Sequence, residues 1–76
     1  MSYLDELQEI FYELFDDAPK LSSLTDASVS DEWDSFMQVQ IVLSVEEKYG
    51  VNFSLEEIEG LNNVGEFIEL IKKYNT

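Results

Sequence analysis

The apolar positions near the N-terminus recur every three or four residues. Within residues 3–15, one helix face collects Leu4, Leu7, Ile10, Phe11, Leu14 and Phe15. Acidic side chains occupy the opposite face, and a helix with this pattern packs its apolar face against a core. Ser2 stands at a position where serine is favoured as an N-cap. The pattern therefore predicts a first amphipathic helix over residues 3–15, capped by Ser2.

The helical pattern stops in residues 16–34. This segment contains Pro19, four serines and several aspartates, and all of these residue types favour turns. Its isolated apolar residues Leu21, Leu24 and Val29 are predicted to anchor it to the helices. A connection of this length in a small domain is typically functional or partly helical.

The most apolar helical stretch covers residues 35–49 and ends at Gly50. Ser35 and Gln38 have the spacing of a capping box, with Ser35 as the N-cap. More than half of the helix circumference is covered by Phe36, Val39, Ile41, Val42, Leu43, Val45 and Tyr49. The remaining stripe contains Gln40, Ser44, Glu47, Lys48 and Met37. We expect a central helix with several packed neighbours, and a solvent-facing Met37 that either contacts a partner or covers a loop.

Two further helices follow a short extended link. Ser54 and Glu57 have capping-box spacing and begin a short helix that ends near Gly60. Asn63 and Glu66 give a weaker version of this signal before residues 64–74, which place Val64, Phe67, Ile68, Ile71 and Tyr74 on one face. The chain is therefore predicted to be all-α. We expect a small four-helix bundle of three longer helices and one short helix, with a long first loop, as a single domain over residues 1–76.

Composition and charge narrow the function. The chain has no cysteine and no histidine, which excludes disulfides, His- or Cys-based zinc sites, and Ser-His or Cys-His catalysis. It has 17 acidic and 4 basic residues, giving a formal net charge of −13. This charge disfavours nucleic acid and anionic membranes as partners and favours a basic patch on another protein. With no leader pattern and no stretch of bilayer-spanning length, a cytoplasmic monomer is expected.

The carboxylates form no recognisable catalytic or metal-binding motif. The pairs Glu46-Glu47 and Glu56-Glu57 are neighbours in sequence, and adjacent helical residues point in different directions. The ligand alternation of an EF-hand and a glycine-rich phosphate loop are both missing. The sequence therefore predicts a protein that is not an enzyme and has no metal site.

Ser35 is the residue with the clearest chemical potential. It follows Asp34 at the start of the most apolar helix. Backbone N–H groups at a helix N-terminus lack intrahelical acceptors, and the helix dipole favours a phosphate there. Phosphodiester chemistry on Ser35 is physically reasonable, although most serines in this position are ordinary N-caps.

Asp34-Ser35 followed by the apolar Phe36 resembles the Asp-Ser-Leu signature of the acyl carrier protein family. Further segments resemble successive blocks of that family in the same order: LTDAS at 24–28, EWDS at 32–35, VLSVEEKYG at 42–50, FSLEEI at 53–58 and NVGEF at 63–67. The resemblance covers essentially the whole chain. It implies that a phosphopantetheinyl transferase attaches 4′-phosphopantetheine from coenzyme A to Ser35. The thiol of that arm would carry an acyl group as a thioester, as in fatty acid or polyketide biosynthesis.

The resemblance also implies roles for other residues. Asp34, Glu46 and Glu47 would face basic patches on the transferase and on acyl-transferring, ligating or condensing enzymes. Phe36, Met37 and Gln40 would belong to the same docking face. Six residues match core positions that, in the family, can open to shelter an acyl chain. We expect them on inward faces, and they are Leu43, Val45, Phe53, Ile58, Leu61 and Phe67.

Four residues depart from the carriers of fatty acid synthesis. Phe36 is larger than the usual residue, Met37 and Gln40 replace carboxylates, and Trp33 replaces a small residue. Tryptophan at this place resembles discrete carriers of polysaccharide, cell-envelope or secondary-metabolite pathways, which argues against a housekeeping role. Two alternatives stay open. One is an aminoacyl or peptidyl carrier loaded by an ATP-dependent adenylating enzyme, and the other is an unmodified acidic interaction module.

Overall fold

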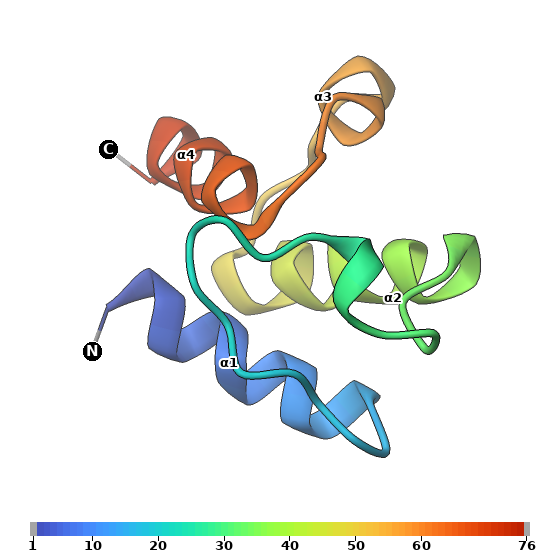
Figure 1. Cartoon of the computed structure of the whole chain (residues 1–76). Helices are drawn as coiled ribbons and strands as arrows, with labels where there is room; N and C mark the ends of the chain where they lie inside the picture. The colour runs from blue at the N-terminus through green and yellow to red at the C-terminus, as the bar shows by residue number, and fades with distance from the viewer. Residues whose placement is uncertain (1, 76) are drawn as a thin grey trace.

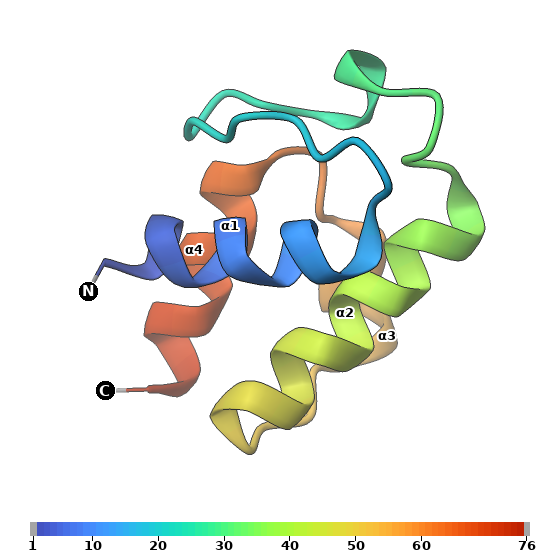
Figure 2. The same cartoon turned by 90° about the horizontal axis from the view of Figure 1, so that it is seen from below.

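The computed structural model describes residues 2–75, and these residues contain four α-helices and one 3-10 turn. The helices are α1 (Tyr3–Leu14), α2 (Ser35–Tyr49), α3 (Leu55–Glu59) and α4 (Val64–Tyr74), with the 3-10 turn η1 at Ala27–Val29. Figure 1 shows α2 between α1 on one side and α3 on the other, and both views place the two chain ends on the same side (Figures 1 and 2). This is the predicted arrangement of three longer helices and one short helix.

The core collects one face of each longer helix. The fully buried side chains are Leu7, Phe11, Ile41, Val45, Val64, Phe67 and Ile71. Burying a large apolar side chain contributes about 1.5–3 kcal/mol relative to leaving it exposed, so these contacts are the main stabilising force. The predicted apolar faces of α1 and α4 are confirmed except at Tyr74, which is 39% exposed at the end of α4. The first helix packs against both α2 and α4.

The prediction for α2 is wrong over one stripe. Phe36, Val39 and Leu43 are 72%, 52% and 53% exposed, whereas Ile41 and Val42 are buried. The exposed residues follow one another at spacings of three and four, so they share one face of the helix. The other helices cover only part of α2, and this face is the part that they leave exposed. An exposed apolar stripe therefore runs along α2 from its first turn.

The helix ends agree closely with the sequence signals. The Ser2 hydroxyl accepts a hydrogen bond from the Asp5 N–H (3.2 Å), and Gly50 ends α2 in the left-handed conformation with φ of 66°. Ser54 and Glu57 form both bonds of the capping box. The first helix ends one residue earlier than predicted, at Leu14.

The long loop is anchored differently from the prediction. Leu21 is buried as expected, but Leu24 (82% exposed) and Val29 (47% exposed) are not anchors. Polar bonds hold the loop instead: the Gln8 side chain donates to the Pro19 carbonyl (3.0 Å) and accepts from the Leu21 N–H (2.8 Å).

The second half of the loop is bound to the start of α4. The Thr25 carbonyl accepts from the Val64 N–H (2.8 Å), and the Ser23 carbonyl accepts from the Gly65 N–H (2.8 Å). A Cβ atom at Gly65 would lie 2.8 Å from the Ser23 oxygen, so glycine permits this close approach. Backbone pairing, which leaves no periodic signal in a sequence, therefore fixes the loop.

Hydrogen bonds to a single carboxylate, that of Glu57, join α3 to α4. We call Glu57 and its three donors, Ser54, Lys73 and Tyr74, the Glu57 cluster. Glu57 accepts from Lys73 Nζ (2.7 Å), from the Tyr74 hydroxyl and from the Ser54 N–H (2.9 Å). These bonds, the Lys73 bond first, lower the pKa of Glu57 from 4.5 to about 2. A carboxyl whose folded-state pKa is depressed stabilises the fold above its unfolded pKa, and this contribution is lost as the pH falls through the folded value.

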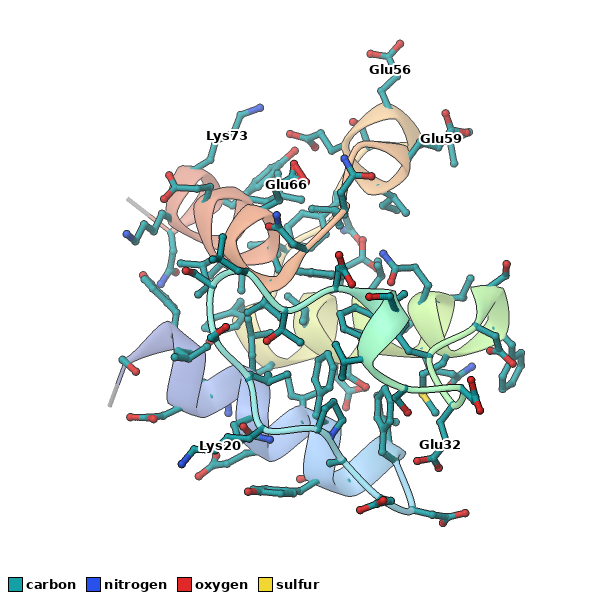
Figure 3. All side chains as sticks on the ribbon, viewed as in Figure 1. Lys20, Glu32, Glu56, Glu59, Glu66 and Lys73 are labelled. Atoms are coloured by element: carbon teal, nitrogen blue, oxygen red, sulfur yellow. The ribbon has the colours of Figure 1, made fainter. Side chains whose placement is uncertain are left out.

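We therefore expect the Glu57 cluster to lose its stabilising effect between about pH 4.5 and about pH 2. The measurement is the free energy of unfolding in urea for wild type and Glu57→Gln at several pH values. Their difference should be largest near neutral pH and shrink across that window. Glu56, which extends outward from α3 (Figure 3), offers Glu56→Gln as the matched control with a smaller pH-dependent difference. Parallel curves for wild type and Glu57→Gln would contradict this account.

Candidate functional site

Asp34, not Ser35, is the N-cap of α2. The Asp34 carboxylate accepts from the Met37 N–H (2.9 Å), and the Asp34 backbone is extended. Aspartate and serine are about equally good caps, so local sequence could not choose between them. The turn before α2 determines which of the two residues caps the helix, because it leaves the Asp34 backbone extended and its carboxylate facing the first helical N–H groups. The predicted capping box of Ser35 and Gln38 is therefore wrong.

This shift of one residue changes the state of Ser35. Its side chain is exposed at the first position of α2, and its hydroxyl makes no hydrogen bond within residues 2–75. The backbone N–H groups of Ser35 and Phe36 also find no acceptor in that part of the chain. An accessible hydroxyl thus stands beside two free donors at the positive end of a fifteen-residue helix, a setting that favours an attached phosphate.

Trp33 fixes the chain just before this site. Its ring is buried and meets Phe11 and Phe15 edge to face, with ring centroids 5.1 Å and 6.4 Å away. The indole N–H donates to Gln38 Oε1 at 2.6 Å, so the buried donor is satisfied. Gln38 is thus a partner of Trp33 rather than a capping residue.

Glu32 joins the same segment to the end of α1. One carboxylate oxygen accepts from the Asp16 N–H (2.9 Å) and the other from the Asp17 N–H (3.1 Å). Figure 3 labels Glu32 where the loop passes this end of α1. Trp33 and Glu32 together hold the start of α2, and with it Ser35, against the first helix.

An open groove of about 550 Å³ adjoins Ser35. One side is formed by the start of α2 and the other by α3 with the link that follows it. Its lining residues are Ala27, Trp33, Asp34, Ser35, Gln38, Ile58, Glu59, Leu61 and Asn62. The sequence interpretation missed the contributions of Gln38, Glu59 and Asn62, because only the folded chain places the end of α3 and the link after it opposite the start of α2.

The residues expected to meet partners are in different surroundings. Phe36 is exposed next to Ser35, whereas Met37 is half-buried and packs against the core. Met37 therefore does not face solvent as predicted. Gln40 is also half-buried.

The expected docking carboxylates are not equivalent either. Asp34 is exposed but its carboxylate caps α2. Glu46 is half-buried and accepts from the Phe53 N–H (2.8 Å), so it holds the link after α2. Glu47 is exposed and carries no comparable bond within the described residues.

The expected acyl-sheltering residues divide into three groups. Val45, Phe53 and Phe67 are buried in the core, as predicted. Ile58 and Leu61 are half-buried and line the groove beside Ser35. Leu43 is 53% exposed on α2, so its predicted inward position is wrong.

Other site types are not found in residues 2–75. This part of the chain has no group of three or more His, Cys, Asp or Glu residues arranged to hold a metal ion. None of its helices has the length and apolar character needed to cross a membrane.

The fold and the exposed Ser35 define a small helical carrier, and comparison with known proteins gives its family. The sequence model described as "Phosphopantetheine attachment site" matches residues 5–71. The chain belongs to this family, which consists of non-catalytic carriers with phosphopantetheine as their cofactor. A comparison with curated protein sequences gives no match.

A solved structure supports the same assignment. The solution NMR structure of holo acyl carrier protein from Geobacter metallireducens is 38% identical and superposes with a TM-score of 0.85. The alignment covers 96% of this chain and 85% of that one. The predictions of an all-α carrier fold, of phosphopantetheine and of a non-enzymatic protein are confirmed. Carrier domains of this family are modified by phosphopantetheinyl transferases, which confirms that class of partner.

Proposed function

We propose that Ser35 carries the phosphopantetheine arm and that the protein presents an acyl group on it to cytosolic biosynthetic enzymes. The observation that carries this proposal is the unbonded, exposed hydroxyl of Ser35 at the first position of α2, beside the free N–H groups of Ser35 and Phe36. These donors and the helix dipole stabilise a phosphodiester at that oxygen. When attached, the arm supplies the thiol on which the acyl group is held as a thioester.

The groove suits the arm that would be attached at its edge. Ile58 and Leu61 offer apolar surface, and Gln38 and Asn62 offer polar groups. Ser35 itself lines the groove, so an arm attached to its hydroxyl would begin at the groove. The assignment to an acyl rather than an aminoacyl cargo is supported by the similarity to a holo acyl carrier protein.

The partner surface is proposed to be the exposed apolar stripe of α2. Phe36, Val39 and Leu43 form it, starting one residue after Ser35. Residues 35–45 contain no charged side chain although the whole chain has a formal charge of −13. Any enzyme that reaches Ser35 must approach this stripe, so we expect apolar contact there, with the surrounding carboxylates supplying long-range attraction to basic partners.

The test is the intact mass after incubation with coenzyme A and a broad-specificity phosphopantetheinyl transferase. We expect wild type to gain one phosphopantetheine and Ser35→Ala to gain none, because the accepting oxygen is missing. Circular dichroism should show that Ser35→Ala remains folded, since Asp34 and not Ser35 caps the helix. Ser23 in the preceding loop supplies a matched control, because its side chain is also exposed and makes no hydrogen bond within residues 2–75: Ser23→Ala should be modified like wild type.

Failure to modify a folded wild-type protein with several transferases would overturn this proposal. It would favour the alternative of an unmodified acidic interaction module. Modification of Ser35→Ala would instead place the arm on another residue.

A further inference from the structure

The groove beside Ser35 contains a carboxamide whose orientation is fixed by a second side chain. The indole of Trp33 can only donate, and it donates to Gln38 Oε1 (2.6 Å). Gln38 therefore turns its oxygen toward the indole and its NH₂ group away from it. This NH₂ group donates to no acceptor within residues 2–75, although Gln38 is half-buried and lines the groove. The protein thus holds an oriented hydrogen-bond donor for an occupant of the groove.

The position of this donor relates it to one part of the phosphopantetheine arm. Gln38 follows Ser35 by three residues in α2, and helical residues at this spacing share a face with their Cβ atoms about 5–6 Å apart. The donor therefore lies one helical turn from the hydroxyl to which the arm is proposed to be attached. The part of the arm that directly follows the phosphate is the pantoyl unit, which has a hydroxyl, two methyl groups and an amide carbonyl.

The opposite side of the groove offers apolar surface to the same unit. Ile58 and Leu61 are half-buried, pack against the core and line the groove. The pantoyl methyl groups would remove water from this surface, while the pantoyl oxygens could accept from the Gln38 NH₂ group. The arm beyond its phosphate is uncharged, so the groove carboxylates of Asp34 and Glu59 do not repel it. Glu59 also extends outward from α3 (Figure 3).

From this geometry we propose that Gln38 holds the proximal half of the arm by donating from its NH₂ group to a pantoyl oxygen, with the pantoyl methyl groups on Ile58 and Leu61. Trp33 acts as a positioning residue, because its indole fixes the orientation of the Gln38 carboxamide. The thiol and its cargo lie beyond this contact, so the proximal half rests in the same place in the holo and the acylated protein. This inference rests on the proposed attachment at Ser35 and names the residues that hold the attached arm.

The experiment follows the arm by NMR with and without cargo. Apo protein labelled with ¹⁵N and ¹³C is converted to the holo form from coenzyme A and to the butyryl form from butyryl-coenzyme A, and intact mass confirms each product. The attached arm is unlabelled, so isotope-filtered NOEs identify contacts of its pantoyl methyl protons, which we expect with Ile58 and Leu61. Exchange of the Gln38 side-chain NH₂ protons should be about two- to tenfold slower in both loaded forms than in the apo form, as expected for one additional hydrogen bond.

Gln38→Glu tests the donor, because glutamate keeps an acceptor for Trp33 and removes the NH₂ group. The NOEs from the pantoyl methyl protons should then weaken about twofold or more, while the single indole N–H resonance shows that the Trp33 contact persists. Gln40→Glu adds the same charge to the same helix outside the groove and should keep the NOEs.

Trp33→Phe tests the positioning role. It keeps an aromatic ring but removes the donor that orients the carboxamide, so loading should slow the Gln38 NH₂ exchange less than in wild type. A role of Trp33 in stability alone would leave this ratio between apo and holo exchange rates unchanged, and that result would overturn the positioning role.

The other possible failures are separable. Absence of any mass gain would overturn the attachment at Ser35 and this inference with it. Normal attachment without pantoyl NOEs, and with equal Gln38 NH₂ exchange in the apo and holo forms, would overturn the holding of the arm alone. Pantoyl NOEs that appear only in the butyryl form, or that survive Gln38→Glu at full strength, would also overturn it.

Discussion

Trp33→Ala is expected to destabilise the protein by about 3–5 kcal/mol, the usual cost of removing a large buried aromatic side chain. Trp33 is 6% exposed and contacts the rings of Phe11 and Phe15. A small domain has a total stability near the low end of about 5–15 kcal/mol, so most of it would be lost. Urea unfolding followed by circular dichroism at 222 nm measures this change without relying on the tryptophan signal.

Trp33→Ala should also slow the modification of Ser35 by more than the fraction of unfolded protein explains. Trp33 holds the residues that cap α2, and its indole holds Gln38, so its removal loosens the helix start that presents Ser35. We expect slower transfer of phosphopantetheine to Trp33→Ala even at temperatures where it is folded.

Trp33→Phe separates packing from hydrogen bonding. It retains an aromatic ring against Phe11 and Phe15 but leaves Gln38 Oε1 without its donor. We expect a loss of only about 1–2 kcal/mol, from the missing hydrogen bond and the smaller ring. A midpoint of unfolding for Trp33→Ala equal to that of wild type would show that this aromatic cluster does not hold the loop and α2 together.

The helices of this protein could be predicted from its sequence because their signals are local. Apolar spacing in α1 and α4 predicts which faces are buried, and the capping motifs at Ser54 and Asn63 lie within four residues of their bonding partners. Gly50 likewise ends α2 through its own backbone conformation. Such signals remain readable without knowledge of the tertiary structure.

The site was less predictable because its details depend on distant residues. The spacing of Phe36, Val39 and Leu43 is the same whether that face is buried or exposed, so only the number of neighbouring helices decides. Glu32 binds N–H groups that lie 15 and 16 residues before it. Asp34 and Ser35 are both good caps, so the register of α2 could not be read locally.

The second large effect is expected for the exposed stripe on α2. The double variant Phe36→Ser/Leu43→Ser should raise the KM of a phosphopantetheinyl transferase for the apo protein about 10- to 100-fold, because contact residues at the centre of an interface typically contribute more than 1 kcal/mol each. The kcat should change less, since the Ser35 hydroxyl and the Asp34 cap are retained. Both side chains are more than half exposed in the free protein, so stability should be nearly unchanged.

A matched control removes one exposed aromatic and one exposed leucine elsewhere. Tyr12 on α1 is 64% exposed and Leu24 in the long loop is 82% exposed, and Tyr12→Ser/Leu24→Ser should leave KM close to that of wild type. An equal rise in KM for both double variants would mean that general surface polarity, not the stripe, governs binding.

Salt distinguishes apolar docking from docking by charge. Raising NaCl screens the attraction between the acidic chain and a basic enzyme, so KM should rise for wild type and for the stripe variant alike. Their KM ratio should nevertheless stay constant, because contact between apolar side chains is not screened. If the double variant binds like wild type while salt alone abolishes binding, the carboxylates and not Phe36 and Leu43 form the docking surface. A constant ratio would mean that charge attracts partners to the protein and that the uncharged stripe beside Ser35 holds them there.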